Sequence, residues 1–470
     1  MKAFMYPSSV SVRFAPSPTG RMHLGNMRAA VMNYIFAQQK KGTFILRIED
    51  TDANRNHDPQ AEKILSDMNW LGLAYNDGPY FQSQRLEIYQ KQLNLLQKNK
   101  SIYRCFCTTN ELDKRRNRQI ALKQPPRYDR TCINNSEAQE QEYLQQKKPY
   151  IWRMKLDKNK KVTINDLSHG AITFDFNNFS DFPVTRQDGS FTFMFANFVD
   201  DMNMNITHVL RGEDHLSNTA GQVALYNAFS VTPPIFWHMP ILCNKDGKKM
   251  SKRDFGFSLQ DLIDGGYLPE SIINYLALIG GSQFKSEILS LKDIVRDFDF
   301  AHISSNSQVK YDVKKLNWIN HKWIQKLSPQ DLSHHAQKII TKQFPLFKPV
   351  SNEKLTSILQ ILKPSFTTLN DIEKEINFYF VAPKFSREKI NSLSSVDAIV
   401  ALVKKSDFDI TNLQSFKQNL ATAKISLKEA FQFLRMSLTG EKMGPSIAEL
   451  VSILGLNETQ KRLNDMIKNI

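Results

Sequence analysis

The sequence contains few cysteines and no long apolar segment. Only 4 of its 470 residues are cysteine, which excludes the dense disulfide framework of small secreted domains. No stretch approaches the roughly 20 consecutive apolar residues of a membrane-spanning helix, and the N-terminus lacks an apolar run of signal-peptide length. These absences predict a soluble cytoplasmic protein without a membrane partner, in a chain long enough for several domains.

Acidic residues are also in deficit. The 62 lysines and arginines exceed the 47 aspartates and glutamates, which gives a formal net charge of +15. The basic residues are spread along the chain, as at 114–116, 158–161 and 314–315, rather than gathered in one tail. Solubility alone could explain basic charge, but this distribution favours a long surface that follows a folded nucleic acid and binds it less tightly as salt rises.

A strand, a helix and a second strand are predicted near the N-terminus. Residues 10–14 alternate apolar with polar or small side chains, and prolines and a glycine at 16–20 end this strand. Apolar residues recur at helical spacing over 27–35, and residues 43–48 form a second apolar run. Such a βαβ unit makes the sheet parallel, and ligands of parallel sheets bind at the carboxyl ends of the strands.

Two short segments far apart in the chain carry the strongest chemical signal. Residues 16–26, PSPTGRMHLGN, combine a turn, a backbone free to approach a phosphate, and the imidazole of His23 at the expected start of a helix. Residues 249–253, KMSKR, place three cations and a hydroxyl on a polar loop. This loop is either a solvated basic run or a clamp that closes on a triphosphate and stabilises charge developing on the pyrophosphate leaving group. Together the two segments predict an ATP site.

Four motifs, in this order and spacing, resemble bacterial glutamyl-tRNA synthetases, which are class I aminoacyl-tRNA synthetases. They are R-x-A-P-S-P-T-G-x-x-H-x-G-N, R-I-E-D-T-D, R-G-E-D-H-L-S-N-T and K-M-S-K-R, and the resemblance extends through essentially the whole chain. The first and last match the family's HIGH and KMSKS signatures, with Asn26 in place of the final histidine. The resemblance assigns catalysis and ATP binding to His23, Gly25, Asn26, Lys249, Met250, Ser251, Lys252 and Arg253.

The resemblance implies ATP-dependent attachment of L-glutamate to the 3′ end of tRNA-Glu through a glutamyl-adenylate, with Mg²⁺ accompanying the ATP. Family members typically bind tRNA before they activate glutamate. Nothing in the sequence demands more than a monomer. Two rival classes are a truncated paralogue that glutamylates a modified base and a non-catalytic RNA-binding descendant. The long helical C-terminus argues against the first, and the retained His23 and Lys252 argue against the second.

An α/β fold in four domains is implied. A Rossmann-type catalytic domain with a parallel sheet carries an inserted acceptor-binding domain, and all-α stem-contact and anticodon-binding domains follow. The expected ranges are 1–102 with 190–255 for the catalytic domain, 103–189 for the insertion, 256–320 for the stem-contact domain and 321–470 for the anticodon-binding domain. In the C-terminal half, capping-box patterns predict helix starts at Ser394, Thr411 and Ser426.

The acidic side chain of glutamate requires cations that stay charged, and arginine also binds a carboxylate through two parallel hydrogen bonds. The resemblance assigns the substrate carboxylates to Arg13 and Arg211, and the α-ammonium group to Glu49. The alternative is that an arginine at such a strand end pairs structurally with Asp50 or Asp214. The resemblance adds Ala15, Ser17, Phe193 and Asn197 to the glutamate site.

Two positions depart from the family's pattern and bear on substrate choice. The family usually has P-T-Y where this chain reads F-T-F, so Phe193 keeps the ring but lacks a hydroxyl that would reach the substrate carboxylate. Discriminating members place an arginine that reads the last anticodon base where Ser365 stands here, in a segment that begins at Lys363. These departures raise the hypothesis of a relaxed or paralogous enzyme that charges tRNA-Gln with glutamate.

Three cysteines predict a structural zinc site. Cys105 and Cys107 form C-x-C, and Cys132 follows in a segment poor in large aliphatic residues and rich in charge. The alternative is that the cysteines pack in a small core. Zinc-bearing family members have C-x-C and Y-x-x-x-C, often with a histidine two residues later. This chain keeps the tyrosine, Tyr128, but has Asn134 in place of the histidine, so Tyr128 or water would be the fourth ligand.

Overall fold

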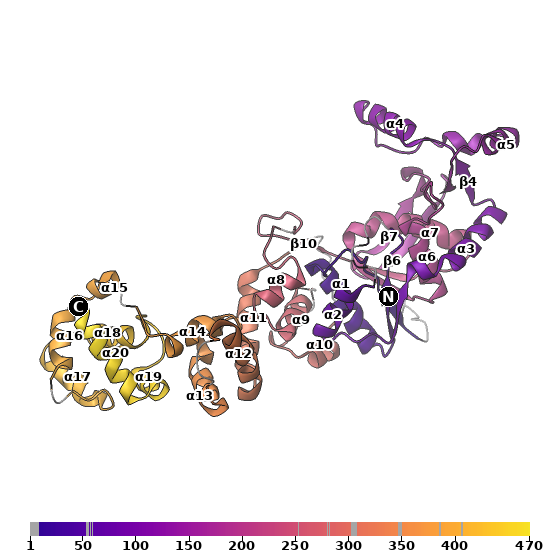
Figure 1. Ribbon diagram of the computed structural model, residues 1–470. Coiled ribbons are helices and arrows are strands. Elements are labelled where there is room, and N and C mark those ends of the chain that lie inside the picture. Colours follow the sequence, from indigo (N-terminus) through magenta and orange to yellow (C-terminus); the bar gives the residue numbers. More distant parts are fainter. Residues whose placement is uncertain are drawn as a thin grey trace. The chain divides into compact units, whose positions relative to one another are not determined.

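The computed structural model describes residues 9–52, 56, 58, 60–251, 253–279, 281, 283–301, 308–345, 350–384, 387–405 and 408–470. It divides into two compact units (Figure 1). The N-terminal unit comprises Met1–Leu262 and Pro269–Val313, and the C-terminal unit comprises Ile263–Leu268 and Lys314–Ile470. The four-domain division is not tested by this separation and stays a prediction.

The N-terminal unit is built on parallel strands, which confirms the βαβ prediction. Strands β1 (Ser11–Phe14), β2 (Thr43–Ile48) and β3 (Asp77–Phe81) form a parallel sheet in that order, and helix α1 (Leu24–Gln39) connects β1 to β2. The Thr207 N–H donates to the Ser11 carbonyl at 3.0 Å, so β8 (His208–Gly212) begins beside β1. The carboxyl ends of β1, β2 and β8 therefore lie along one edge.

A second sheet joins segments that are distant in the sequence. Its order is β7-β6-β9-β8, where β6 (Lys161–Asp166) and β7 (Gly170–Asp175) form an antiparallel hairpin and β9 (Ile235–Met239) is parallel to β8. Strand β6 meets β9 in parallel where Asp166 lies opposite Phe236. Part of the segment predicted as an insertion thus contributes a buried carboxylate beside β9.

Helices cover these strands on both sides (Figure 1). Apolar side chains of α3 (Leu86–Lys98), α6 (Phe193–Asn203) and α7 (Leu216–Ala228) form one core with β8 and β9. Helix α1 is buried on most of its surface because it contacts the strands as well as α9 (Pro269–Leu278) and α10 (Leu291–Asp297). Helix α2 (Glu62–Trp70) also lies in this unit, and α8 (Leu259–Asp264) begins in it.

The segment that contains the three cysteines is a small structure around an antiparallel strand pair. Strands β4 (Ile102–Cys105) and β5 (Ile151–Met154) pair, and helices α4 (Thr109–Ala121) and α5 (Glu137–Gln145) lie between them in the sequence. Neither helix has a buried residue, and each begins with a capping box. The sequence is therefore helical here because of its caps rather than because of an apolar face.

Helices joined by turns and loops, without a strand, make up the described part of the C-terminal unit, and they share one core. Its helices are α11 (Val313–Lys326), α12 (Pro329–Gln343), α13 (Asn352–Leu362), α14 (Asp371–Phe380), α15 (Arg387–Asn391), α16 (Val396–Val403), α17 (Leu413–Thr422), α18 (Leu427–Thr439), α19 (Ile447–Leu454) and α20 (Leu456–Lys468). No helix within the described ranges is long and apolar enough to span a bilayer.

Three local expectations need correction. The region after residue 255 is not purely helical, because β11 (Gln308–Lys310) pairs in parallel with β10 (Ile241–Cys243) in the N-terminal unit. Ser394 and Thr411 do not cap helices: their hydroxyls donate to the carboxylates of Glu429 and Asp409, at 2.8 and 2.7 Å. A charged acceptor nearby competes for such hydroxyls. The predicted cap of α18 at Ser426 is confirmed.

Candidate active site

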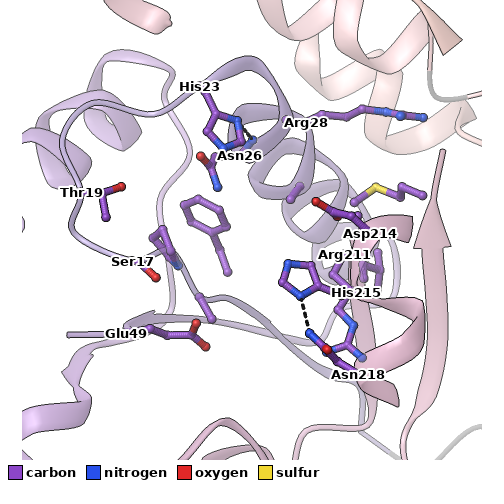
Figure 2. Close-up of a pocket in the computed structure, with 18 of the residues that line it drawn as sticks. Ser17, Thr19, His23, Asn26, Arg28, Glu49, Arg211, Asp214, His215 and Asn218 are labelled. Atoms are coloured by element: carbon purple, nitrogen blue, oxygen red, sulfur yellow. Dashed lines mark hydrogen bonds between the residues drawn. The ribbon is translucent and has the colours of Figure 1, made fainter. Parts of the chain in front are cut away.

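A cavity of about 660 Å³ opens at the carboxyl ends of β1, β2 and β8 (Figure 2). It brings together these predicted site residues: Arg13, Ala15, Ser17, His23, Gly25, Asn26, Glu49, Phe193, Asn197, Arg211, Lys249 and Met250. Ser251 and Arg253 are not among the lining residues, and Lys252 lies outside the described residues. The roles assigned to these side chains stay predictions, but their placement at one sheet edge follows from the topology.

His23 begins helix α1 as its N-cap residue. Its Nδ1 accepts a hydrogen bond from the Asn26 N–H at 3.2 Å, which satisfies one of the helix's free amide groups. Desolvation of the ring and the charge of Lys249 lower the pKa of His23, so the imidazole is neutral near pH 7. A Cβ at Gly25 would lie 3.1 Å from His23 Cε1, so a side chain at residue 25 would displace the imidazole.

The segment that follows KMSKR contacts the first signature segment, although the two are far apart in the sequence. The Leu24 N–H donates to the Phe257 carbonyl at 2.7 Å, and the His23 ring stacks on Phe257 with centroids 5.4 Å apart. Just before this contact, Ser251 donates its N–H and its hydroxyl to the Asp254 carboxylate, at 2.8 and 3.0 Å. The loop after β10 is thereby fastened to the start of α1.

Lys249 forms an exposed ion pair at the mouth of the cavity. Its Nζ lies 2.8 Å from Asp214 Oδ2, and the two side chains are 65% and 44% exposed. Ion pairs this exposed contribute little to stability, typically about 0–1 kcal/mol. A more highly charged anion entering the cavity can therefore take Lys249 from Asp214 at small cost.

The buried end of the cavity contains a network of charged groups. Arg13 Nε lies 3.0 Å from Asp201 Oδ1, and Arg47 Nη1 lies 2.7 Å from the same oxygen. Burial alone would raise the pKa of Asp201, but the two guanidinium groups hold it below its usual value. The structural partner of Arg13 is therefore Asp201. The alternative partner Asp50 was wrong, because its carboxylate accepts instead from the Ser83 N–H and hydroxyl at 2.8 and 2.6 Å.

A chain of hydrogen bonds connects Glu49 to Arg211. Asn197 Nδ2 donates to Glu49 Oε1 at 2.5 Å, and Gln222 Nε2 donates to Asn197 Oδ1 at 2.7 Å. Arg211 Nη2 completes the chain by donating to Gln222 Oε1 at 2.8 Å. Burial raises the pKa of Glu49, although Arg47 and Asn197 oppose this. A carboxylate in this setting gains from a cationic ligand group beside it.

A second series of buried hydrogen bonds orients the Arg211 side chain. Arg211 Nη2 donates to Thr219 Oγ1 at 2.6 Å, Thr219 Oγ1 lies 2.9 Å from His238 Nε2, and His238 Nδ1 lies 2.7 Å from Asp166 Oδ2. Burial and the charge of Arg13 lower the pKa of Arg211 to about 9, so it remains a cation near pH 7. Arg211 is thus held by Thr219 and Gln222 rather than by the alternative partner Asp214.

Sequence reasoning missed several of these residues. Thr219, His215 and Asn218 belong to the R-G-E-D-H-L-S-N-T motif, so their spacing after Arg211 could have suggested them. Asp166 and His238 carry no such signal, because only the pairing of β6 with β9 brings them together.

The cysteine cluster lies apart from the cavity. The sulfur atoms of Cys105, Cys107 and Cys132 all lie within 4.8 Å of one another, and the three thiols are buried and not in disulfides. Tyr128 Oη lies 3.3 Å from Cys105 Sγ and 3.8 Å from Cys107 Sγ. Hydrogen bonds from Cys107 and Cys132 lower the pKa of Cys105, and Arg115 Nη1 donates to Cys107 Sγ at 3.5 Å. Three thiols this close together fit three of the four positions of a tetrahedral zinc ion.

The two predicted anticodon residues lie in a short 3-10 turn, Lys363–Ser365. Lys363 Nζ donates to the Leu327 carbonyl at 2.8 Å, and Ser365 Oγ donates to the Leu362 carbonyl at 2.7 Å. Burial lowers the pKa of Lys363. Both side chains make contacts within the C-terminal unit, and their role in RNA binding stays a prediction.

Two family models match the chain. Residues 9–318 match the catalytic domain of class I tRNA synthetases (E and Q), and residues 331–467 match an anticodon binding domain. The chain is 34% identical to glutamate–tRNA ligase 1 of Caldanaerobacter subterraneus subsp. tengcongensis over 98% of each chain. It is 35% identical to glutamate–tRNA ligase 1 of Pseudothermotoga lettingae over 97% of this chain and 100% of the relative. A crystal structure of a glutamate tRNA ligase from Elizabethkingia meningosepticum, in complex with its amino acid, aligns with a TM-score of 0.87 and 31% identity over 98% of this chain and 99% of that chain.

Proposed function

The chain belongs to the class I tRNA synthetases of the glutamate and glutamine group, and from this we propose that it is an ATP-dependent glutamate–tRNA ligase. It attaches L-glutamate to the 3′ end of tRNA-Glu through a glutamyl-adenylate, and it acts in the cytoplasm as a monomer. One observation carries the proposal: the buried side chains of Arg13, Arg211 and Glu49 line the same cavity as the His23 helix start and Lys249. An amino acid with a second carboxylate, joined to ATP, matches this distribution of charge.

The first step is adenylate formation. The α-carboxylate oxygen of glutamate attacks the α-phosphorus of ATP in line, the bond to the β-phosphate oxygen breaks, and pyrophosphate leaves towards the loop of residues 249–253. Bound Mg²⁺ would neutralise part of the phosphate charge. Glu49 holds the α-ammonium group, and Arg13 and Arg211 hold the carboxylates. The neutral His23 and the amide groups at the start of α1 position the phosphates and adenosine.

The second step transfers the amino acid. A hydroxyl of the terminal ribose of tRNA attacks the glutamyl carbonyl, the bond to the adenylate phosphate breaks, and AMP leaves. The phosphate of the adenylate accepts the hydroxyl proton. The chain's own residues therefore contribute position and charge in both steps.

The relatives support the proposal of tRNA-Glu. Three that match over nearly their full length are named glutamate–tRNA ligases, so the hypothesis of tRNA-Gln charging is not favoured. Lys363 and Ser365 are proposed as anticodon contacts because they lie within the matched anticodon binding domain. The segment 103–189 is proposed to bind the acceptor end, in keeping with its basic residues.

A charging assay tests this function directly. Purified chain, ATP, Mg²⁺ and labelled glutamate are incubated separately with tRNA-Glu and tRNA-Gln, and pyrophosphate exchange is measured with and without tRNA. We expect glutamylation of tRNA-Glu and none of tRNA-Gln. Equal charging of both tRNAs would contradict the specificity, and absence of any exchange or charging would identify a binding protein rather than a ligase.

We also propose one structural Zn²⁺, held by Cys105, Cys107 and Cys132, with Tyr128 or water as the fourth ligand. The mutual approach of the three sulfur atoms, with Tyr128 Oη beside two of them, supports it. Metal analysis should find one zinc per chain in the purified protein and none in Cys132→Ser. Tyr128→Phe separates the two candidates for the fourth ligand: loss of zinc affinity identifies the phenol, and unchanged affinity identifies water. A metal-free wild-type protein with the same melting temperature would refute the proposal.

A further inference from the structure

We propose that His215 determines specificity in the glutamate site by donating a hydrogen bond from Nε2 to the substrate's side-chain carboxylate. The His215 ring lies beside Phe193, where the family usually has a tyrosine with a hydroxyl. The inference rests on the proposed function and adds a further contact with the same substrate.

The orientation of glutamate in the cavity follows from what surrounds it. Its α-carboxylate has to reach ATP, which binds near His23 and the exposed Lys249 at the mouth. The side chain therefore points to the opposite, buried end, where Arg211 is only 7% exposed. Its second carboxylate meets Arg211 there.

Arg211 cannot hold this carboxylate with its full fork of donors. Nη2 already donates to Thr219 and Gln222, and Nε donates to His238 at 3.4 Å. Arg13 is committed in the same way, because its Nε and Nη2 face Asp201. Among the described residues no hydrogen bond occupies Nη1 of either arginine, so this nitrogen is left for the substrate. A carboxylate accepts about four hydrogen bonds. The two N–H groups of one Nη1 diverge, so each arginine directs one of them at a given carboxylate, and a further donor completes its hydrogen bonds.

His215 lies in the place where that donor is needed. It ends the short turn Glu213–His215, directly before α7, and lines the cavity together with Phe193 and Arg211. The rings of His215 and Phe193 lie 5.9 Å apart, centroid to centroid, at an angle of 39°. Figure 2 shows the imidazole turned into the cavity, with Asn218 behind it.

Asn218 fixes which ring nitrogen carries the proton. Its Nδ2 lies 3.2 Å from His215 Nδ1, and an amide nitrogen can only donate. Nδ1 is therefore the acceptor, and Nε2 carries the hydrogen. Among the described residues no hydrogen bond occupies Nε2, which leaves its N–H for a ligand.

The imidazole also stays neutral. Desolvation and the neighbouring charges of Arg211 and Arg13 lower the pKa of His215 to about 4, and Asp214 opposes them only in part. A neutral ring with one defined N–H discriminates between a carboxylate and an amide better than a rotating hydroxyl, because its donor cannot turn into an acceptor at the same place.

Three substitutions in the full chain test the proposal. His215→Gln places an amide N–H near the position of Nε2, whereas His215→Asn is one methylene shorter and does not reach it. His215→Phe removes every donor. The KM for glutamate should rise about 10- to 100-fold in His215→Asn and His215→Phe, the range expected for a hydrogen bond to a charged group, and recover most of this in His215→Gln. The KM for ATP should change less than about twofold in all three.

A double substitution provides an independent test of the missing donor. Phe193→Tyr should restore glutamate affinity about 10-fold in the His215→Asn background, because the tyrosine hydroxyl supplies the missing donor. An unchanged KM for glutamate in His215→Asn, an equal defect in His215→Gln, or absence of rescue by Phe193→Tyr would overturn the inference. Melting temperatures identify variants that fail to fold, and the Gln and Asn variants form the matched pair. A wild-type protein that charges no tRNA with glutamate would refute the proposed function instead.

Discussion

The buried end and the mouth of the active-site cavity are built on opposite principles. At the buried end, Arg13, Arg47, Glu49 and Asp201 hold one another through ion pairs and hydrogen bonds with almost no exposure. At the mouth, Lys249 meets Asp214 in an exposed pair. Under the proposed function, the contrast separates two tasks: we infer that the fixed arrangement selects glutamate and that the loosely held cation stabilises the leaving group.

Neutralisation of Asp201 should have the largest effect on stability. In Asp201→Asn, two buried guanidinium groups lose their shared counter-charge, so the free energy of unfolding should fall by about 3–5 kcal/mol. Urea unfolding followed by circular dichroism measures this. Asp246→Asn, on the exposed turn before Lys249, is the control and should be neutral. An equal loss of unfolding free energy in both variants would show that the buried ion pairs of Asp201 contribute no more to stability than an exposed carboxylate.

Acid should weaken glutamate binding through Glu49. Burial raises the pKa of Glu49, whereas Arg13 and Arg47 keep the pKa of Asp201 low, so Glu49 takes up a proton first as the pH falls. The charge that faces the α-ammonium group is then lost, and KM for glutamate should rise up to about 10-fold per pH unit below the pKa of Glu49. Steady-state kinetics at several pH values should show this rise in KM for glutamate in the wild type. In Glu49→Gln the KM should be high and independent of pH. A rise that persists in Glu49→Gln would come from the titration of another group.

Asp166 should affect glutamate binding without touching the substrate. It holds Nδ1 of His238, which in turn faces the Thr219 hydroxyl that accepts from Arg211. As a positioning residue, Asp166→Asn should raise KM for glutamate about 10-fold or less and leave KM for ATP unchanged. Thr163→Ala, on the same strand but exposed, provides the control. A parallel rise in both KM values would indicate a general loss of structure.

The smallest change in stability and in KM for glutamate is expected from a substitution at the mouth of the cavity. Asp214→Asn removes the partner of Lys249, and because the pair is exposed the free energy of unfolding should change by less than about 1 kcal/mol. Thermal melting and the KM for glutamate should both stay near wild-type values. A large destabilisation would mean that the mouth is as rigid as the buried end.

Local sequence patterns predicted the strand and the helix start that depend mainly on neighbouring residues. The alternation in 10–14, the turn residues and the imidazole before residue 24 were sufficient to place β1, the start of α1 and the first half of the active site. The same reasoning was wrong for the caps at Ser394 and Thr411, because it could not see the carboxylates of Glu429 and Asp409 that take their hydroxyls.

The partners of the buried arginines lay beyond the sequence. Asp201 is 188 residues after Arg13 and reaches it only through the placement of α6. Asp166 is 72 residues before His238 and meets it only because β6 pairs with β9. Sequence spacing predicts which side chains carry chemistry, but the packing of the sheet decides which groups hold them in place.

The most direct test of the division between the two ends compares Arg211→Lys with Lys249→Met. Steady-state kinetics of tRNA glutamylation would be measured for each variant with glutamate and ATP varied separately. We expect Arg211→Lys to raise KM for glutamate about 10-fold or more at unchanged KM for ATP, because lysine loses the guanidinium geometry. We expect Lys249→Met to lower kcat about 10- to 100-fold at unchanged KM for glutamate. If both variants change the same parameter to the same extent, the two ends of the cavity do not have separate tasks.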